Sequence, residues 1–377
     1  MRVLHVMSCR GWSSDAYWAA RAAVELERAG HEVTLCCRRG TEARVIARAR
    51  AAGVRRVETL ALVGGFHPAD DAADVRRLRA WLPGFDAVHV HRGKEHWLVA
   101  AANRLAPARR PLIRTRHIVQ AVRPHRLNRW LYGQATDRVV AVTEAIRRQL
   151  VGAGLVAESR AVALPGGVDL EAFRGAPAPE AARAALGLHA ATPVPEGAPW
   201  IGVVAGFRAM KGHAIVLDAV ARLRAAGRQL ILVLAGQGGH EASVHEQARA
   251  RGLGDRVVFP GTVADVAALM AALDVALYVP LESDGMSRVL FEYLAAGRPV
   301  VASRVGAACE LLRDGEHARL VPAGDAAALA AAIDALLDDP ALARRLAGAG
   351  RALVESRLSG ACVARRLADL YTEIAAR

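Results

Sequence analysis

Short apolar runs alternate with helical stretches along almost the entire chain. One series of apolar runs occupies residues 2–7, 31–37, 85–90, 111–115, 137–142 and 160–164, and a second occupies residues 200–206, 229–236, 256–261, 274–280, 298–303 and 318–322. A strand, a helix and another strand in repeated succession are typical of right-handed crossovers between parallel strands. Strands that are buried on both faces are apolar throughout, as these runs are. The alternation therefore predicts an α/β protein with two doubly wound parallel sheets.

The segment between the two series is rich in Ala, Pro and Gly. Its prolines, among them Pro193 and Pro195, make a continuous helix or strand across it unfavourable. We therefore expect a first domain over residues 1–173, a linker over 174–199 and a second domain over 200–356. A length of 377 residues suits two such domains. Two sheets that face one another would form a cleft between the carboxyl ends of their strands, where open α/β sheets bind ligands.

The net charge of +13 lies entirely in the first half of the chain. Residues 1–170 carry 28 Lys and Arg against 15 Asp and Glu, whereas residues 171–377 carry 22 of each. The arginines are densest over residues 104–129, which contain no acidic residue. Such a segment suits an anionic membrane surface or a phosphorylated glycolipid, although a solvated Arg-rich face is the simpler interpretation. No zinc-finger, RNP or helix-turn-helix pattern favours a nucleic-acid partner.

The cysteines and the apolar runs indicate in which cellular compartment the protein acts. The five cysteines form no CxxC pair and have no His at metal-ligand spacing, which favours free thiols in a reducing cytoplasm and no zinc site. No apolar run reaches the ~18–20 residues that a membrane span needs. We therefore expect any membrane contact to be peripheral.

The segment that follows the apolar run 274–280 combines a glycine-containing turn with the predicted start of a helix. Free backbone N–H groups and a positive dipole end at such a position suit a diphosphate. The residues at this start are Gly285, Met286, Ser287 and Arg288. Asp284 in the loop can accept hydrogen bonds from sugar hydroxyls, and Glu292, about two turns into the helix, can bind a second polyol such as ribose.

The first loop of the second domain, GFRAMKGH over residues 206–213, contains Arg208 and Lys211. Two cations between a strand and a helix can stabilise the charge that grows on a leaving diphosphate without a metal ion. Lys211 is one of only two lysines in the chain, and its compact ammonium group is not interchangeable with a guanidinium. A pair of solvent-facing cations is the simpler alternative.

The sequence DGMSRVLFEYLAAGRPV, from Asp284 onward, resembles the signature of the retaining family 4 glycosyltransferases of GT-B fold. In that signature an acidic residue precedes a glycine-containing turn, and a Glu follows at the eighth position. Further correspondences are Gly11 with Trp12, AGHEV at 29–33, PGGVD at 165–169, AGQGG at 235–239 and FPGTV at 259–263. The resemblance implies two Rossmann-like domains that face a cleft, with a C-terminal helix over 357–377 that returns to the N-terminal domain.

The resemblance also implies roles for individual residues. A lone His is more often structural than catalytic, but His117 matches a family His that contacts the donor sugar. The implied catalytic residues are His117, Arg208, Lys211 and Asp284. The implied donor-binding residues are Gly11, Gly236, Val263, Gly285, Met286, Ser287, Arg288 and Glu292. The acceptor is expected to contact His91, Lys94, Arg114 and Arg116, which follow or end strands of the first domain.

The activity that the resemblance implies is transfer of a hexose or heptose from a UDP-, GDP- or ADP-sugar to a hydroxyl of a glycan or glycolipid. RTRH at 114–117 and the Arg-rich segment after it are similar to transferases of lipopolysaccharide core and other surface polysaccharides. We expect no cofactor and no metal, and a cytoplasmic protein held on the inner membrane face by the 104–129 arginines. The alternatives are a nucleotide-sugar 2-epimerase of the same architecture and a non-catalytic glycan- or polyanion-binding protein.

Overall fold

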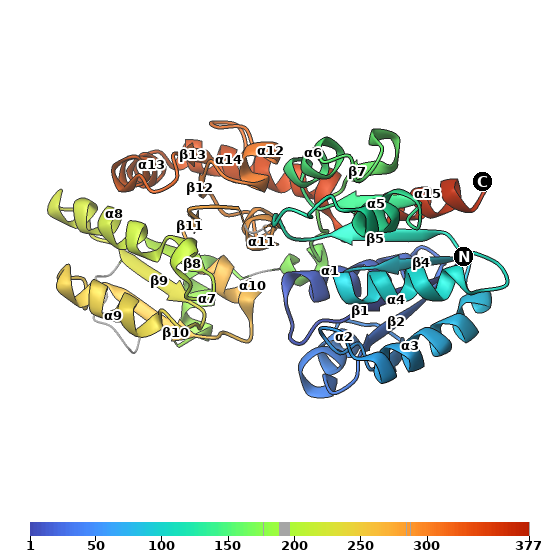
Figure 1. Cartoon of the computed structure of the whole chain (residues 1–377). Coiled ribbons are helices and arrows are strands. Elements are labelled where there is room, and N and C mark those ends of the chain that lie inside the picture. The colour runs from blue at the N-terminus through green and yellow to red at the C-terminus, as the bar shows by residue number, and fades with distance from the viewer. Residues whose placement is uncertain (176, 188–196, 284, 287, 377) are drawn as a thin grey trace. The chain divides into compact units, whose positions relative to one another are not determined.

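The computed structural model describes residues 1–175, 177–187, 197–283, 285–286 and 288–376, which divide between two compact units. Unit 1 comprises Met1–Gly167 and Leu358–Arg377, and unit 2 comprises Val168–Arg357. Each unit contains one parallel sheet with helices packed against it (Figure 1). The prediction of an α/β protein with two doubly wound, Rossmann-like sheets is therefore confirmed.

The sheet of unit 1 has seven strands in the order β3-β2-β1-β4-β5-β6-β7. The strands are β1 (Arg2–Met7), β2 (Glu32–Arg38), β3 (Arg56–Leu60), β4 (Ala87–Val90), β5 (Leu112–Arg116), β6 (Arg138–Ala141) and β7 (Ala161–Ala163). The chain moves outward from β1 to β3 and then returns to β4 on the other side of β1, which makes β1 and β4 the topological switch point. The register pairs His5 of β1 with His89 of β4, so both side chains lie on the same face.

The helices of unit 1 include the C-terminal one. They are α1 (Ser14–Arg28), α2 (Ala47–Ala51), α3 (Pro68–Trp81), α4 (Gly93–Arg104), α5 (Arg126–Gly133), α6 (Glu144–Gly152) and α15 (Gly360–Ala375). Helix α15 begins where the Ser359 hydroxyl accepts a hydrogen bond from the Cys362 backbone, and it packs against α1. An ion pair between Arg138 and Glu373 joins it to β6. Both ends of the chain therefore belong to unit 1, as Figure 1 shows.

The sheet of unit 2 has six strands in the order β10-β9-β8-β11-β12-β13. The strands are β8 (Trp200–Val204), β9 (Ile231–Ala235), β10 (Val257–Gly261), β11 (Val275–Tyr278), β12 (Val300–Ser303) and β13 (Arg319–Val321). The helices are α7 (Pro179–Ala185), α8 (His213–Ala225), α9 (Glu241–Ala250), α10 (Val266–Ala271), α11 (Arg288–Ala295), α12 (Ala307–Leu311), α13 (Ala326–Asp338) and α14 (Pro340–Leu353). Leu217, Leu232 and Ile333 lie in its core, which α8 and α13 share.

The segment expected to be a linker is partly a packed element of unit 2. Pro179 stands at the start of α7, where a missing backbone N–H is harmless, so it begins a helix instead of breaking one. Ala182 of α7 is buried, and Arg183 donates a hydrogen bond of 2.6 Å to Asp274 while its guanidinium lies over the Trp200 ring. The unit boundary falls between residues 167 and 168, not after 173. Residues 188–196, with Pro193 and Pro195, lie outside the described part of the chain.

Among the described residues, no helix combines the length and the hydrophobicity that crossing a membrane requires.

Candidate functional site

Two loops at the carboxyl ends of β8 and β9 pack backbone to backbone in unit 2. Gly236 has a φ of 144°, and a Cβ atom on it would lie 2.1 Å from the carbonyl oxygen of Ala205. Gly212, which follows Lys211, has a φ of 74°, and a Cβ atom there would lie 2.1 Å from the carbonyl oxygen of Val279. Both positions therefore require glycine. This close packing holds the Lys211 turn against the end of β11.

A pocket of about 200 Å³ lies between these loops and the start of α11. Residues from four separate segments surround it, including Gly206, Gly236, Thr262, Val263, Arg288 and Glu292. All four segments follow the carboxyl ends of strands, which is where parallel sheets bind ligands. The pocket therefore joins Gly236, Val263, Arg288 and Glu292, which are far apart in the sequence.

Glu292 is the buried carboxylate of this pocket, with only 7% of its surface exposed. Its Oε1 lies 3.2 Å from Nε of Arg288, one helical turn away. Burial raises the pKa of Glu292, and the positive charge of Arg288 opposes that rise. The neighbouring Tyr293 hydroxyl accepts a 2.6 Å hydrogen bond from the Val204 backbone and ties α11 to β8. Glu292 is thus a buried carboxylate at the edge of the pocket, on a helix that is tied to β8.

The cationic loop of unit 2 contains Arg208 and Lys211 on a single turn between β8 and α8. The Lys211 backbone N–H donates to the carbonyl of Arg208 at 2.9 Å, and Leu281 N–H donates to Met210 at 2.8 Å. Burial, together with the nearby charge of Lys211, lowers the pKa of His213 to about 4. The turn therefore adjoins the segment that leads from β11 to α11.

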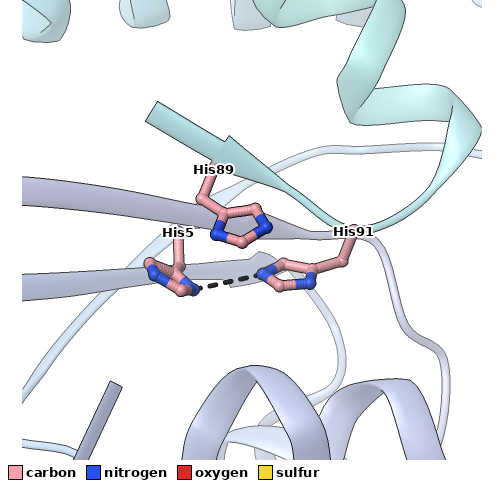
Figure 2. A group of neighbouring side chains, drawn as sticks. All are labelled: His5, His89 and His91. Atoms are coloured by element: carbon pink, nitrogen blue, oxygen red, sulfur yellow. Dashed lines mark hydrogen bonds between the residues drawn. The ribbon is translucent and has the colours of Figure 1, made fainter. Parts of the chain in front are cut away.

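A group of buried histidines occupies the switch point of unit 1. His5 of β1, His89 and His91 near the end of β4, and His117 after β5 lie within one cluster. His5 Nδ1 lies 3.1 Å from His91 Nε2, and His91 Nδ1 lies 3.2 Å from His117 Nε2. Figure 2 shows the bond between His5 and His91, with the ring of His89 beside them. The Tyr371 hydroxyl of α15 reaches both His5 and His89.

Known proteins and protein families resemble this chain over most of its length. The family model "Glycosyltransferase Family 4" matches residues 17–172, and "Glycosyl transferases group 1" matches residues 188–353. The phosphatidyl-myo-inositol mannosyltransferase of Mycobacterium leprae is 31% identical over 314 residues, which cover 79% of this chain and 77% of that protein. The chain belongs to glycosyltransferase family 4. It is a nucleotide-sugar-dependent glycosyltransferase, as its sequence motifs predicted.

This family 4 glycosyltransferase is also similar to a solved structure and to a second relative in sequence. The structure of Anabaena HepE in complex with UDP and glucose matches it with a TM-score of 0.81 at 20% identity, over 99% of this chain and 100% of that one. That likeness supports the GT-B fold. The lipopolysaccharide core biosynthesis glycosyltransferase LpsE of Rhizobium meliloti is 31% identical over 182 residues, or 48% of this chain and 51% of that protein.

Three of the four residues predicted to contact the acceptor of this glycosyltransferase are buried or paired with other side chains in unit 1. His91 is buried, and both of its ring nitrogens face other histidines. Arg114 is only 2% exposed. Lys94 is held by Asp71, with 2.5 Å between Nζ and Oδ1, and it donates a 2.7 Å hydrogen bond to Gly65. The sequence locates these residues near strand ends but does not reveal which way each side chain points.

Arg116 of the glycosyltransferase differs from those three. It lines a pocket of about 320 Å³ in unit 1 together with Gly93, Arg123 and His125. One of its guanidinium nitrogens donates to the carbonyl of Gln120, and its buried Nε has no partner among the described residues. Arg116 therefore remains a candidate for contact with an anionic ligand.

The other predicted residues are distributed between the two units. Gly11 follows β1 in unit 1, and its carbonyl accepts a 2.9 Å hydrogen bond from Ser13, which precedes α1. Gly285 and Met286 are buried beside the start of α11 in unit 2. Asp284 and Ser287 lie outside the described residues. The sequence did not predict His5, Thr115 or Tyr371 as site residues. His5 lies within hydrogen-bond distance of His91, and Thr115 and Tyr371 lie within hydrogen-bond distance of His89.

Proposed function

We propose that this enzyme transfers a sugar from a nucleoside diphosphate sugar to a hydroxyl of a glycan or glycolipid, with retention of anomeric configuration. The observation that carries the proposal is the pocket of unit 2 that joins Gly236, Val263, Arg288 and Glu292. A buried carboxylate beside glycine-lined backbone suits a nucleotide, because ribose hydroxyls donate to the carboxylate while flat groups approach the glycines closely.

The transfer step uses positive charge in unit 2. As the bond between C1 of the sugar and the diphosphate oxygen breaks, charge grows on the diphosphate, and Arg208, Lys211 and the N-terminus of α11 stabilise it. A new bond from C1 to the acceptor oxygen forms on the same face of the sugar. The acceptor proton passes to the leaving phosphate oxygen, so the reaction needs neither a separate base nor a metal ion.

The remaining site residues complete this scheme. Asp284 accepts hydrogen bonds from hydroxyls of the donor sugar, while Gly285, Met286 and Ser287 border the phosphates. Gly11 and His117 are the residues of unit 1 for which we propose a part in the transfer step. None of these roles requires a bound cofactor.

The acceptor binds to unit 1 and carries an anionic group that Arg116 recognises. The pocket that Arg116 shares with Arg123 supports this assignment. The M. leprae relative is named for phosphatidyl-myo-inositol and the R. meliloti relative for lipopolysaccharide core. These names favour an acceptor on a lipid or a surface glycan.

A peripheral attachment to an anionic membrane follows from the same region. Ile118 and Leu127 are 47% and 64% exposed, and Arg123 and Arg126 are exposed beside them in the sequence. Exposed apolar side chains among arginines are the combination that binds the headgroup region of anionic membranes. We therefore assign the enzyme to the cytoplasmic face of the membrane, in cell-surface glycan synthesis.

A donor panel tests the proposal directly. UDP-, GDP- and ADP-sugars are each mixed with the full-length enzyme, and the melting temperature is measured, because a ligand that binds the folded state must raise it. We expect one nucleotide class to raise the melting temperature and its sugar to be transferred or slowly hydrolysed. No shift and no turnover with any donor would contradict the proposal. Salt-sensitive DNA binding without turnover would favour the polyanion-binding alternative.

A further inference from the structure

A continuous chain of hydrogen bonds runs through unit 1 from Thr115 to His117. It begins at Thr115 Oγ1, which lies 2.6 Å from His89 Nε2, and His89 Nδ1 lies 2.6 Å from the Tyr371 hydroxyl. That hydroxyl lies 3.1 Å from His5 Nε2, and the chain continues through His91 to Nε2 of His117 by the two contacts described above. The chain therefore crosses β5, β4, β1 and α15.

Burial favours the neutral form of the four histidines in this chain of hydrogen bonds. Burial lowers the pKa of His5 and of His117 to about 3, and it lowers the pKa of His89 and His91 well below the ordinary value. A neutral imidazole has one N–H donor and one nitrogen acceptor. Each ring must therefore donate at one end and accept at the other. The bonds all point the same way unless the Tyr371 hydroxyl accepts from both His5 and His89, and that arrangement would leave both the Tyr371 proton and Nδ1 of His117 unpaired among the described residues.

The two possible directions leave different numbers of groups unpaired. If the bonds point from His117 toward Thr115, the Thr115 hydroxyl accepts from His89, and its own proton has no acceptor among the described residues. In that case Nδ1 of His117 is also an unprotonated acceptor that has no partner within the described part of the protein. If the bonds point from Thr115 toward His117, the hydroxyl proton is used, and the unpaired group is the Nδ1–H of His117. Because each buried unpaired group is unfavourable by about 1–3 kcal/mol, the second direction is preferred.

We propose that Thr115 and Tyr371 fix His117 in its Nδ1–H form, so that His117 offers a hydrogen-bond donor to an oxygen of the bound substrate. The buried Nδ1 atom lacks a partner within the described residues, so an oxygen of the substrate would satisfy an Nδ1–H donor there. Thr115 and Tyr371 act as positioning residues. The substrate contact rests on the proposed glycosyl transfer, whereas the tautomer of His117 does not.

A metal ion is the competing occupant of the cluster. His5, His89 and His91 place ligand atoms within 4.8 Å of one another (Figure 2). Each of their ring nitrogens, however, already lies 2.6–3.2 Å from a hydrogen-bond partner. Besides burial, the positive charge of Arg114 lowers the pKa of His89 and His91, and a divalent cation would meet the same repulsion. The contacts therefore favour the hydrogen-bond chain.

The tautomer can be measured without any substrate. Long-range ¹H–¹⁵N spectra of the full-length enzyme labelled in its histidines distinguish Nδ1–H from Nε2–H rings, and the His117→Gln variant assigns the His117 signals. We expect the Nδ1–H form in the wild type and a mixture of forms in Tyr371→Phe, which separates His89 from His5. Thr372→Val removes a neighbouring hydroxyl that donates within α15 to Ala368, and it should leave the spectrum unchanged.

Thr115 provides a second variant pair if Tyr371→Phe folds poorly. Thr115→Ser keeps the hydroxyl that starts the chain and should preserve the Nδ1–H form, whereas Thr115→Val removes it and should produce the mixture. In transfer assays we expect Thr115→Val and Tyr371→Phe to lower kcat roughly tenfold, as the loss of one hydrogen bond would. The affinity for the free nucleotide should not change in either variant.

Three results would overturn the inference: an Nε2–H ring at His117 in the wild type, an unchanged His117 signal in both disrupting variants, or a stoichiometric metal ion found by elemental analysis of the purified protein. If the wild type has the expected tautomer but transfers no sugar, the proposed function fails and the hydrogen-bond chain stands. If the wild type transfers sugar but its His117 has the Nε2–H form, the inference about the hydrogen-bond chain fails and the proposed function stands.

Discussion

Glu292 and Arg288 lie one turn apart on α11, and the 3.2 Å between Arg288 Nε and Glu292 Oε1 holds the buried carboxylate at the edge of the unit 2 pocket. An exposed pair of this spacing contributes only a few tenths of a kcal/mol to helix stability. Burial and position at the pocket, more than the ion pair, therefore set Glu292 apart from an ordinary surface carboxylate.

Glu292→Gln tests that role. The amide is similar in size but loses the charged acceptor, so we expect kcat/KM for the donor to fall by roughly 10- to 100-fold, the range for a hydrogen bond to a charged group. Glu355→Gln is the matched control, because Glu355 pairs with Arg351 at the same spacing on an exposed surface of unit 2. Similar kinetics for Glu292→Gln and the wild type would contradict a donor-binding role.

Lys211→Ala removes one of the two cations of the turn between β8 and α8. We expect kcat to fall by about 10²- to 10³-fold, because the charge acts on the leaving diphosphate. Lys211→Arg should recover only part of this loss, since a planar guanidinium does not fit where a compact ammonium stands. Steady-state kinetics with the identified donor measure both values. Arg224→Ala is the control. Arg224 lies at the far end of α8, where it pairs with Asp255, and its replacement should leave kcat at the wild-type value. A comparable loss of kcat in Arg224→Ala would argue against a specific role of Lys211.

The sequence predicted the parts of the fold that depend on local pattern. Each apolar run matches a strand, because a parallel sheet buries both faces of its inner strands. The strand β3 was not predicted, because it lies at the edge of its sheet and its first four side chains alternate between exposed and partly buried instead of forming an apolar run. The glycine-containing start of α11 and the KG turn are equally local, since Gly212 is required by contacts of its own backbone. Such features need no knowledge of distant residues, and they predicted Glu292 on the helix that borders the unit 2 pocket.

The hydrogen-bond chain of histidines could not be predicted from local sequence, because it depends on contacts between distant elements. The alternation of His89 and His91 predicts that both lie on one face of a strand. Their partners, however, come from the pairing of β1 with β4 and from Tyr371 on the returning C-terminal helix. The same holds for Lys94, whose partner Asp71 belongs to another helix. Side-chain direction at a strand end depends on such tertiary neighbours.

Asp15 provides a prediction about pH. Burial alone would raise the pKa of this carboxyl, but hydrogen bonds from Arg92 at 2.5 Å and from Ser13 outweigh burial and lower the pKa to about 2. A carboxyl with a depressed folded-state pKa stabilises the fold above its unfolded pKa of 3.8, and that contribution is lost as the pH falls toward 2.

Asp15→Asn should therefore lower the free energy of unfolding at pH 7 by roughly 1–2 kcal/mol. The difference between variant and wild type should shrink steadily between pH 4 and pH 2. Urea unfolding at a series of pH values, followed by tryptophan fluorescence, measures it. A difference that stays constant over this range would show that the ion pair with Arg92 is not its source.

The exposed segment around Leu127 predicts binding to anionic vesicles. Each basic residue near such a surface contributes about 1 kcal/mol, so reversing Arg123 and Arg126 together should weaken binding to phosphatidylglycerol vesicles by at least roughly 30-fold. Leu127→Gln should weaken it less, and binding should fall with added salt. Arg222→Glu with Arg224→Glu in α8 changes the net charge equally and serves as the control, measured by vesicle co-sedimentation. Equal losses in both double variants would indicate attraction by net charge alone, and no binding by the wild type would contradict the membrane assignment.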